Sequence, residues 1–310
     1  MIDLGDYGHP PSTRRRDYPL VLLQLMQRMR LELLLLLTIA VLINSDVVPR
    51  GWTANGNVVR ILGIAASIFI GFRNTQAIQR WWEARQLWGA ILIVSRSWAD
   101  TLRAYLNSDR INRNKERQLL QLQIALVWQL NFELRNFWHR ELRELQERLL
   151  DGLKLPRNSS LRQLCLQRAE WIRNLYHQGH IDSFGRLQLM QVANACTEAI
   201  GGLERIRNTP LPASYDVFVR LLTWLFGLLL LLYFHDPGSR NQNPISGVLI
   251  VLLFLMAERI GAYVEGPFDS DGSSFSLPLD SICLTISHDL LDRDVDHVQH
   301  LNSKDPVRWT

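Results

Sequence analysis

The sequence is poor in cysteine and lacks the short motifs that mark nucleophilic or phosphate-binding sites. Its three cysteines, Cys165, Cys196 and Cys283, are far apart and odd in number, so they indicate neither a disulfide framework nor a zinc site. No serine or cysteine stands in a recognisable nucleophile motif, and no glycine-rich loop is suited to hold a phosphate. We therefore expect a protein that is not an enzyme and that uses no cofactor.

Segments in which apolar and polar residues alternate, as in half-buried strands, are also lacking. The polar middle of the chain instead has apolar residues at spacings of three and four among charges, which is typical of amphipathic helices. Pro156 and Ser159 mark the start of one such helix, and Asp182 is suited to cap another that ends at Asn208. The sequence predicts an all-α fold.

The sequence also has no concentrated patch of positive charge. The chain of 310 residues has a net charge of +4, a pI near 9.1 and a mean hydropathy of −0.03. Nearly all the positive charge is arginine, and in the middle of the chain the arginines are interleaved with glutamates. This interleaving argues against nucleic acid as a partner. The N-terminus lacks a small-residue cleavage site and does not resemble a signal peptide.

What the sequence does contain is four apolar blocks, at residues 31–43, 61–72, 217–234 and 244–257. A lone membrane-spanning helix needs about 20 apolar residues, and only the third block approaches that length without its flanks. The blocks are therefore either long buried helices of a soluble protein or membrane helices that neighbouring helices shield.

The placement of arginine favours the membrane. Arginines gather before the first block and after the second, whereas the connectors between blocks one and two and between blocks three and four have few. Positive residues mark the cytoplasmic side of a membrane protein, so both termini and the middle of the chain are expected in the cytosol. A soluble core helix has no reason to sort its arginines in this way.

These observations predict an integral membrane protein with four transmembrane helices and five parts. Residues 1–17 form a cytosolic N-terminal segment, and residues 18–96 form the first two membrane helices. The second of these, from about residue 57 to 96, extends into the cytosol as one continuous helix. Residues 97–212 form a helical cytosolic region, residues 213–264 the third and fourth membrane helices, and residues 265–310 a cytosolic tail.

The second membrane helix has one unusual face. At 100° per residue, one side of the helix spans about 100° and collects a set of residues in the order polar, apolar, polar. This set consists of Asn57, Ile61, Ile64, Ile68, Gly71, Phe72, Thr75, Gln79 and Trp82. An apolar repeat of this kind is most often core packing, but the polar ends suit a water-filled path with a hydrophobic constriction. A single chain cannot surround such a path, whereas copies around a cyclic axis can.

Three motifs resemble the bestrophin family in its bacterial branch. They are "IFIGFRNTQAIQRWWEARQLWG" at residues 68–89, "ERIRNTPLPASY" at 204–215 and "EGPFDSDGSSFSLPLDSICLTI" at 265–286. The resemblance implies a homopentameric ion channel with four spanning helices per subunit and a large helical cytosolic region. It places the protein in the bacterial cell inner membrane with both termini cytoplasmic, and its partners would be other copies of itself, membrane lipids and monovalent ions.

The resemblance also assigns roles to residues of this chain. The family's pore neck falls on Ile64, Ile68 and Phe72, the residues in the middle of the unusual face. A second constriction at the cytosolic exit falls on Phe184, or on Ile181 if the alignment slips by a few positions. The polar residues Asn57, Thr75 and Gln79 would line the pore on either side of the neck.

Charged residues around the second helix are expected to pair. Arg73 and Arg80 lie on the side opposite the unusual face and would meet acids of neighbouring helices, since charges within a membrane seldom persist unpaired. Glu83, Asp216 and Glu258 are the candidate partners.

The acidic stretch after the fourth block leaves two interpretations open. Animal members of the family have a dense acidic run there that forms a calcium clasp, and here only Glu265, Asp269 and Asp271 remain. A hard cation needs six or more oxygen ligands, which these residues alone do not provide. The stretch is either a residual metal site or a solvated loop that anchors the C-terminal tail.

Ion selectivity follows from the sequence only as a weak preference. An apolar neck discriminates by size and dehydration, whereas Asp182 near the inner exit would attract cations and Arg60 at the outer mouth would oppose them. On balance these charges favour monovalent cations over chloride. The alternative function is a non-conducting membrane scaffold or regulatory subunit whose cytosolic region binds a partner.

Overall fold

The computed structural model describes residues 18–45, 49, 52–106, 110–137, 140–235, 243–269 and 276–291. All regular structure in these residues is helical, which confirms the predicted all-α class. The helices belong to two compact units. Of the described residues, unit 1 contains those up to Trp82 and those between 210 and 267. Unit 2 contains those between 83 and 209, residues 268 and 269, and those from residue 276.

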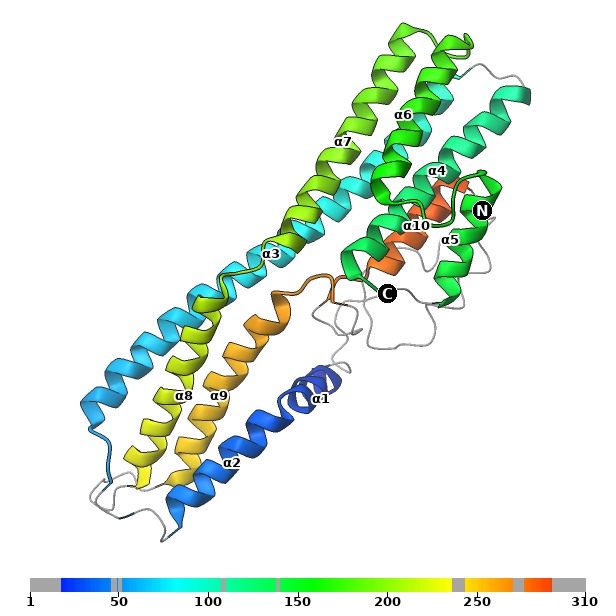
Figure 1. The fold of residues 1–310 in the computed structure, drawn as a ribbon. Helices are drawn as coiled ribbons and strands as arrows, with labels where there is room; N and C mark the ends of the chain where they lie inside the picture. The colour runs from blue at the N-terminus through cyan, green and yellow to red at the C-terminus, as the bar shows by residue number, and fades with distance from the viewer. Residues whose placement is uncertain are drawn as a thin grey trace, which may run out of the picture. The chain divides into compact units, whose positions relative to one another are not determined.

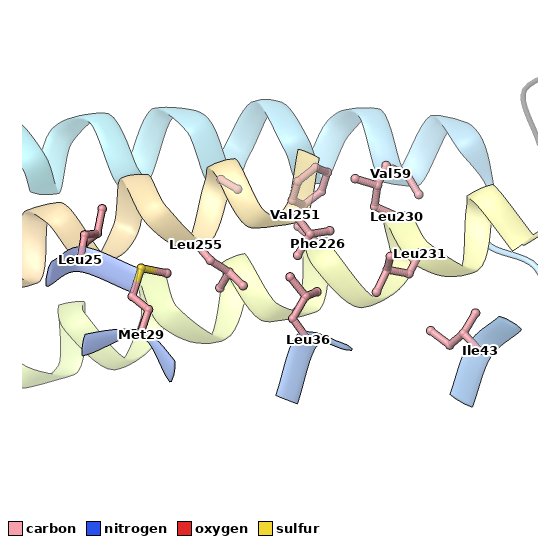
Figure 2. Packing of buried hydrophobic residues seen from close by; sticks show 11 residues of the cluster. Leu25, Met29, Leu36, Ile43, Val59, Phe226, Leu230, Leu231, Val251 and Leu255 are labelled. Carbon is pink, nitrogen blue, oxygen red and sulfur yellow. The ribbon is translucent and has the colours of Figure 1, made fainter. Parts of the chain in front are cut away.

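Unit 1 contains α1 (Tyr18–Arg28), α2 (Arg30–Asn44), the first part of α3 (Gly56–Tyr105), α8 (Ala213–His235) and α9 (Pro244–Val264). Helices α2, α8 and α9 lie against one another (Figure 1). Figure 2 shows the apolar core that they share with α1 and α3, in which Phe226, Val251 and Leu255 meet Leu36. Where unit 1 borders water, the hydrophobic effect from burying these side chains stabilises the contacts between its helices. Where it borders lipid, close packing of the same side chains stabilises them.

Helix α3 has 50 residues and runs without interruption through the charged, tryptophan-rich segment that follows the second apolar block. At 1.5 Å per residue it is about 75 Å long. The prediction of one continuous helix is therefore confirmed, and the helix contributes residues to both units.

The first apolar block differs from the expectation of a single spanning helix. The helix is broken at Met29, whose φ of −86° and ψ of 9° leave the helical region, although the Met29 amide still donates to the Leu25 carbonyl at 3.0 Å. Helix α2 alone has 15 residues. It is about 22 Å long, short of the roughly 30 Å hydrocarbon core. Three described helices, α3, α8 and α9, are long and apolar enough to cross a membrane.

Two glycines allow helices of unit 1 to approach closely. A Cβ atom on Gly63 of α3 would lie 2.9 Å from the Phe226 ring of α8. A Cβ atom on Gly261 of α9 would lie 1.9 Å from Asn74 Oδ1 of α3. The amide group of Asn74 uses this space to donate to the Ala257 carbonyl at 3.0 Å. Small residues at helix contacts are typical of membrane proteins.

Unit 2 contains the rest of α3 together with α4 (Arg110–Arg135), α5 (Arg140–Gly152), α6 (Leu161–His177), α7 (Ser183–Asn208) and α10 (Leu279–Leu291). Trp88 and Trp98 of α3 are fully buried, and the Trp98 indole donates to the Leu119 carbonyl of α4 at 3.3 Å. The tryptophans after the membrane segment thus serve partly as core side chains.

Two helices of unit 2 begin at or close to the residues expected from the sequence. Helix α7 begins after Asp182, whose carboxylate accepts from the Gly185 amide at 2.7 Å, and it ends at Asn208 as predicted. Helix α6 begins one residue later than predicted. Ser160 forms a capping box with Gln163, whereas Ser159 donates its hydroxyl to the Pro156 carbonyl.

Candidate functional site

Helix α3 presents two opposite faces within unit 1. Val59, Ala66, Ile70, Arg73 and Ala77 are buried at intervals of three, four and seven residues. The unusual face identified in the sequence is exposed on the other side. The exposed fractions are 62% for Ile64, 49% for Ile68 and 62% for Phe72, and Asn57, Thr75 and Gln79 are also exposed. The face predicted from a helical wheel is therefore the face that unit 1 leaves uncovered.

The exposed faces of the other apolar helices have a different chemistry. Their large exposed apolar residues are Leu31, Leu34, Leu35, Leu37, Val41 and Leu42 on α2, Val217, Phe218, Leu221, Leu225 and Leu228 on α8, and Ile245, Leu249, Leu253 and Ile260 on α9. Surfaces of this composition suit lipid. The exposed face of α3 instead includes the amides of Asn57 and Gln79. An amide in hydrocarbon loses its hydrogen bonds with water at a cost of several kcal/mol, so this face is suited to water rather than lipid.

Arg73 anchors the opposite, buried face of α3. Its side chain is 2% exposed. Nη1 donates to the Glu258 carbonyl at 2.9 Å and to Glu258 Oε1 at 3.2 Å, and Nη2 donates to Asp216 Oδ1. Glu265 Oε2 lies 3.7 Å from Nη2. One guanidinium therefore joins α3 to both α8 and α9, since Asp216 belongs to α8 and Glu258 to α9.

The buried position of Arg73 determines which way the candidate neck residues face. A buried cation is tolerated only when carboxylates and carbonyls compensate it, so a rotation of α3 that withdrew Arg73 from Asp216 and Glu258 would take the guanidinium away from its compensating groups. The contact thus fixes which side of α3 is turned toward α8 and α9. Phe72, the adjacent residue, is held on the exposed side as a result.

The remaining predicted ion-pair residues have separate partners. Arg80 Nε donates to the Glu265 carbonyl at 3.1 Å, just after the end of α9. Glu83 does not join Arg73 or Arg80 but pairs with Arg205 of α7 in unit 2. Both side chains of that second pair are largely exposed, so it contributes little to stability.

The structure extends the ionic cluster beyond the residues identified from the sequence. Arg259 Nε lies 3.1 Å from Glu258 Oε2, and Arg259 Nη2 lies 3.3 Å from Glu32 Oε1 of α2. Arg220 of α8 lies 3.6 Å from the same Glu32 oxygen. The signal that could have found these residues is their position, because each is a charge inside or beside an apolar block.

The two candidates for the inner aperture differ in exposure. Phe184, the second residue of α7, is 68% exposed, whereas Ile181 is 5% exposed and belongs to the core of unit 2. A residue that narrows a pore has to project from the subunit surface. Exposure therefore favours Phe184 over Ile181.

The candidate metal ligands are not gathered in the described part of the chain. Glu265 Oε1 accepts from the Leu211 amide at 3.2 Å, and its other oxygen faces Arg73. Among the described residues no group of three or more histidine, cysteine, aspartate or glutamate side chains could hold a metal ion. Asp269 is exposed, and Asp271 lies outside the described residues.

Comparisons with known proteins agree on one family. The family model for bacterial and fungal bestrophin proteins matches residues 20–292. The voltage-dependent anion channel-forming protein YneE of Escherichia coli is 30% identical over 232 residues, which cover 74% of each chain. A voltage-dependent anion channel-forming protein of Ralstonia nicotianae is 30% identical over 221 residues, covering 70% of this chain and 71% of the relative.

A solved structure shows the same fold. A crystal structure of a bacterial bestrophin homologue from Klebsiella pneumoniae superposes with a TM-score of 0.72 and 27% sequence identity. The match covers 85% of this chain and 97% of the other. The arrangement of helices described above is therefore that of a known membrane protein fold.

Proposed function

This chain belongs to the bacterial and fungal bestrophin family, and from that premise we propose that it forms an ion channel whose pore is lined by α3. The relatives named as channel-forming proteins support a channel rather than an enzyme. The neck of the pore is formed by Ile64, Ile68 and Phe72, one set from each copy of the chain.

The observation that carries this proposal is the mixed chemistry of the exposed face of α3. Apolar neck residues are flanked by Asn57 on one side and by Thr75 and Gln79 on the other, and all of them are exposed. A wall of this kind admits water at both ends and excludes it in the middle, so ions must shed part of their hydration to pass.

The pore requires several copies of the chain, because one α3 helix cannot enclose a path. We take the assembly to be a homopentamer with four spanning helices per subunit. In this arrangement α1 and α2 together provide the first span, since α2 alone is too short. Residues 97–212, the N-terminal segment 1–17 and the tail 265–310 are on the cytoplasmic side of the bacterial inner membrane. Phe184 narrows the inner exit of the pore.

The sign of the permeating ion depends on the charges near the ends of the pore. Asp182 is exposed two residues before Phe184, and one such carboxylate per subunit favours monovalent cations over chloride at the inner exit. The hydrogen bond from the Gly185 amide offsets part of its charge. The names of the curated relatives point to anions in those proteins. The reversal potential in a salt gradient decides between the two.

The proposal is tested by ion flux into liposomes that contain the purified protein. We expect the wild type to conduct and Ile64→Ala, Ile68→Ala and Phe72→Ala each to raise the flux, because a smaller apolar side chain widens the neck. Leu253→Ala on the lipid-facing side of α9 is the matched control and should leave the flux unchanged. Electrically silent vesicles, or neck variants indistinguishable from the control, would instead favour the scaffold function.

A further inference from the structure

Helix α3 keeps one side buried along most of its length. Ala66, Ala84 and Leu102 follow one another at intervals of 18 residues, and all three are 0% exposed. Because 18 residues are five turns of an α-helix, these three residues point in one direction from the helix axis. The opposite side of the helix therefore also keeps one direction, from the membrane segment to the end of α3.

In unit 2 this opposite side of α3 is exposed, and it includes an acid. Gln86, Ile93 and Asp100 are exposed at intervals of seven residues, which is close to two turns. Asp100 follows Ile64 by 36 residues, or ten turns, so the two residues lie on the same side of the helix. The side of α3 proposed to line the pore therefore has a carboxylate near its cytosolic end.

The Asp100 carboxylate is not neutralised by the arginines beside it on α3. Arg96 precedes it by four residues and Arg103 follows it by three, so each is near enough on the helix surface to pair with it. Arg96 Nη2 instead lies 2.7 Å from Asp289 of α10, and Arg103 Nε lies 3.3 Å from Glu116 of α4. Within the described part of the chain, Asp100 has no ion-pair partner. Its negative charge therefore faces water.

Asp100 also lies close to the residue proposed to narrow the inner exit. A Cβ atom on Gly185 would lie 3.0 Å from Tyr105 Cβ, so the start of α7 packs against the end of α3. Phe184 is the preceding residue of α7, and its side chain is exposed. Tyr105 follows Asp100 by five residues, which is about 8 Å along the helix. The level of Phe184 is therefore about one to two turns of α3 away from Asp100.

We propose that Asp100 lines the inner vestibule, the space between the neck and the inner aperture, and shifts the selectivity of the channel toward cations. Each copy of the chain contributes one such carboxylate, and charges of one sign around a water-filled path concentrate ions of the opposite sign. Asp182 is less suited to this role, because its carboxylate accepts from the Gly185 amide. The role of Asp100 rests on the proposed pore, for which it supplies a residue that influences the sign of the permeating ion.

The role is tested with the full-length protein in liposomes under a tenfold gradient of potassium chloride. Asp100→Asn keeps the size of the side chain and removes its charge. We expect the ratio of potassium to chloride permeability, taken from the reversal potential, to fall at least about threefold, because salt screens part of the roughly tenfold or larger effect of such charges. An unchanged ratio in a conducting variant would overturn the assignment of Asp100. Electrically silent wild-type liposomes would contradict the proposed pore instead.

A matched variant and a change of salt separate a charge effect from a change of shape. Glu141 is exposed on α5, which packs against α4, so Glu141→Gln removes a carboxylate away from the proposed pore and should behave like the wild type. The Debye length falls from about 10 Å at 0.1 M salt to about 3 Å at 1 M. The difference between the wild type and Asp100→Asn should therefore shrink at 1 M. A difference of the same size at both salt concentrations would refute an electrostatic role.

Chemical modification tests the same position with charges of both signs, and it serves if Asp100→Asn fails to fold. Asp100→Cys should react with water-soluble methanethiosulfonate reagents. A sulfonatoethyl reagent adds a negative charge and should raise the ratio of potassium to chloride permeability, whereas a trimethylammonioethyl reagent should lower it. The wild-type protein treated in the same way controls for the native cysteines. A residue 100 that stays unmodified would show that it is covered by a neighbouring copy and does not line the vestibule, and equal shifts with both reagents would contradict a charge effect.

Discussion

Arg73 and Glu258 are joined at two points, because Arg73 Nη1 donates both to the Glu258 carbonyl at 2.9 Å and to its carboxylate at 3.2 Å. The carbonyl contact ties α3 to the backbone of α9, so it depends on the position of the helix as well as on a rotamer. Both side chains are almost completely buried. This contact and the one to Asp216 set the rotation of α3, the helix that presents the proposed neck residues.

Removal of Arg73 is expected to destabilise the protein strongly. Arg73→Gln removes the guanidinium that joins Asp216 to Glu258 and leaves the buried Glu258 with Arg259 alone. Breaking a buried pair in this way costs about 3–5 kcal/mol. Arg205→Gln breaks the exposed pair with Glu83 and should cost about 1 kcal/mol or less. Thermal unfolding of the two variants in detergent compares them directly. Equal shifts in Tm would contradict the anchoring role of Arg73.

A single methyl group on α9 is expected to separate it from α3. Gly261→Ala would place a Cβ atom 1.9 Å from Asn74 Oδ1. Because the same amide donates to Ala257, the side chain cannot move away without losing that bond. Overpacking of this kind typically costs about 1–3 kcal/mol. We expect a lower Tm than for the wild type.

Two further variants make this prediction specific. Gly71→Ala on α3 adds the same methyl group where no atom lies within 4 Å, so it should leave the Tm nearly unchanged. Asn74→Ala combined with Gly261→Ala removes the clash and should recover part of the loss relative to Gly261→Ala alone. Additive effects in the double variant would show that the two residues do not interact.

The exposed face of α3 and the cap of α7 could be predicted from the sequence, because each depends only on residues that are close together in the chain. The exposed face of α3 has a 3.6-residue period that survives in any environment, so Ile64, Ile68 and Phe72 could be placed together without a structure. Asp182 at the start of α7 is a local cap. The relation between Ser159 and Ser160 shows the limit, because both residues suit a cap and only the backbone geometry selects Ser160.

The ionic cluster shows what the sequence leaves open. That Arg73 needs an acid follows from its place beside an apolar block, but which acid depends on how distant segments pack. Glu83 is ten residues away and pairs with Arg205 instead. Glu32 and Arg259 are separated by 227 residues in the sequence, and they form an ion pair only because α2 lies against α9. The break at Met29 likewise could not be predicted, because no proline or glycine stands next to it in the sequence.

Cysteine labelling should distinguish the pore face from the lipid face. Ile68→Cys, Thr75→Cys and Gln79→Cys are expected to react with a charged, membrane-impermeant thiol reagent in the open channel, and modification at residue 68 should block flux. Leu249→Cys on the exposed face of α9 should not react, because lipid excludes the reagent. Labelling of residue 249 at the rate of residue 75 would contradict the assignment of the two faces.

The native cysteines should give little background in this experiment. Cys196 and Cys283 are buried, and burial raises the pKa of the Cys283 thiol well above its usual value. Burial also raises the pKa of Cys165, which is half-buried. The thiolate is the reactive form, so a raised pKa means slow labelling at pH 7 that accelerates as the pH rises toward the pKa. Wild-type labelling measured from pH 7 to 9 checks this sign.

The docking of α10 on α4 is expected to depend on one carboxylate. Asp280 accepts from Asn131 at 2.7 Å and from Arg135 at 3.0 Å, and the Arg135 side chain is nearly buried. Asp280→Ala should increase hydrogen exchange over residues 279–291, because it leaves Arg135 without its carboxylate partner. Asp289 is also on α10 and forms a more exposed ion pair with Arg96 of α3. Asp289→Ala should therefore change hydrogen exchange little. Similar hydrogen exchange in both variants would argue against a special role of Asp280 in the docking of α10.

The charge of Asp182 at the proposed inner aperture is expected to influence ion selectivity. In the proposed pentamer, five Asp182 carboxylates around the inner exit would concentrate cations there. The wild-type reversal potential in a tenfold potassium chloride gradient should then lie toward the potassium equilibrium potential. Asp182→Asn removes the charge and keeps an acceptor for the Gly185 amide, which preserves the cap of α7. We expect its reversal potential to shift toward the chloride value. Arg60→Gln at the other end of the membrane segment should shift it in the opposite direction. A wild-type potential near the chloride value, unchanged in Asp182→Asn, would show that the preference is anionic and is set elsewhere.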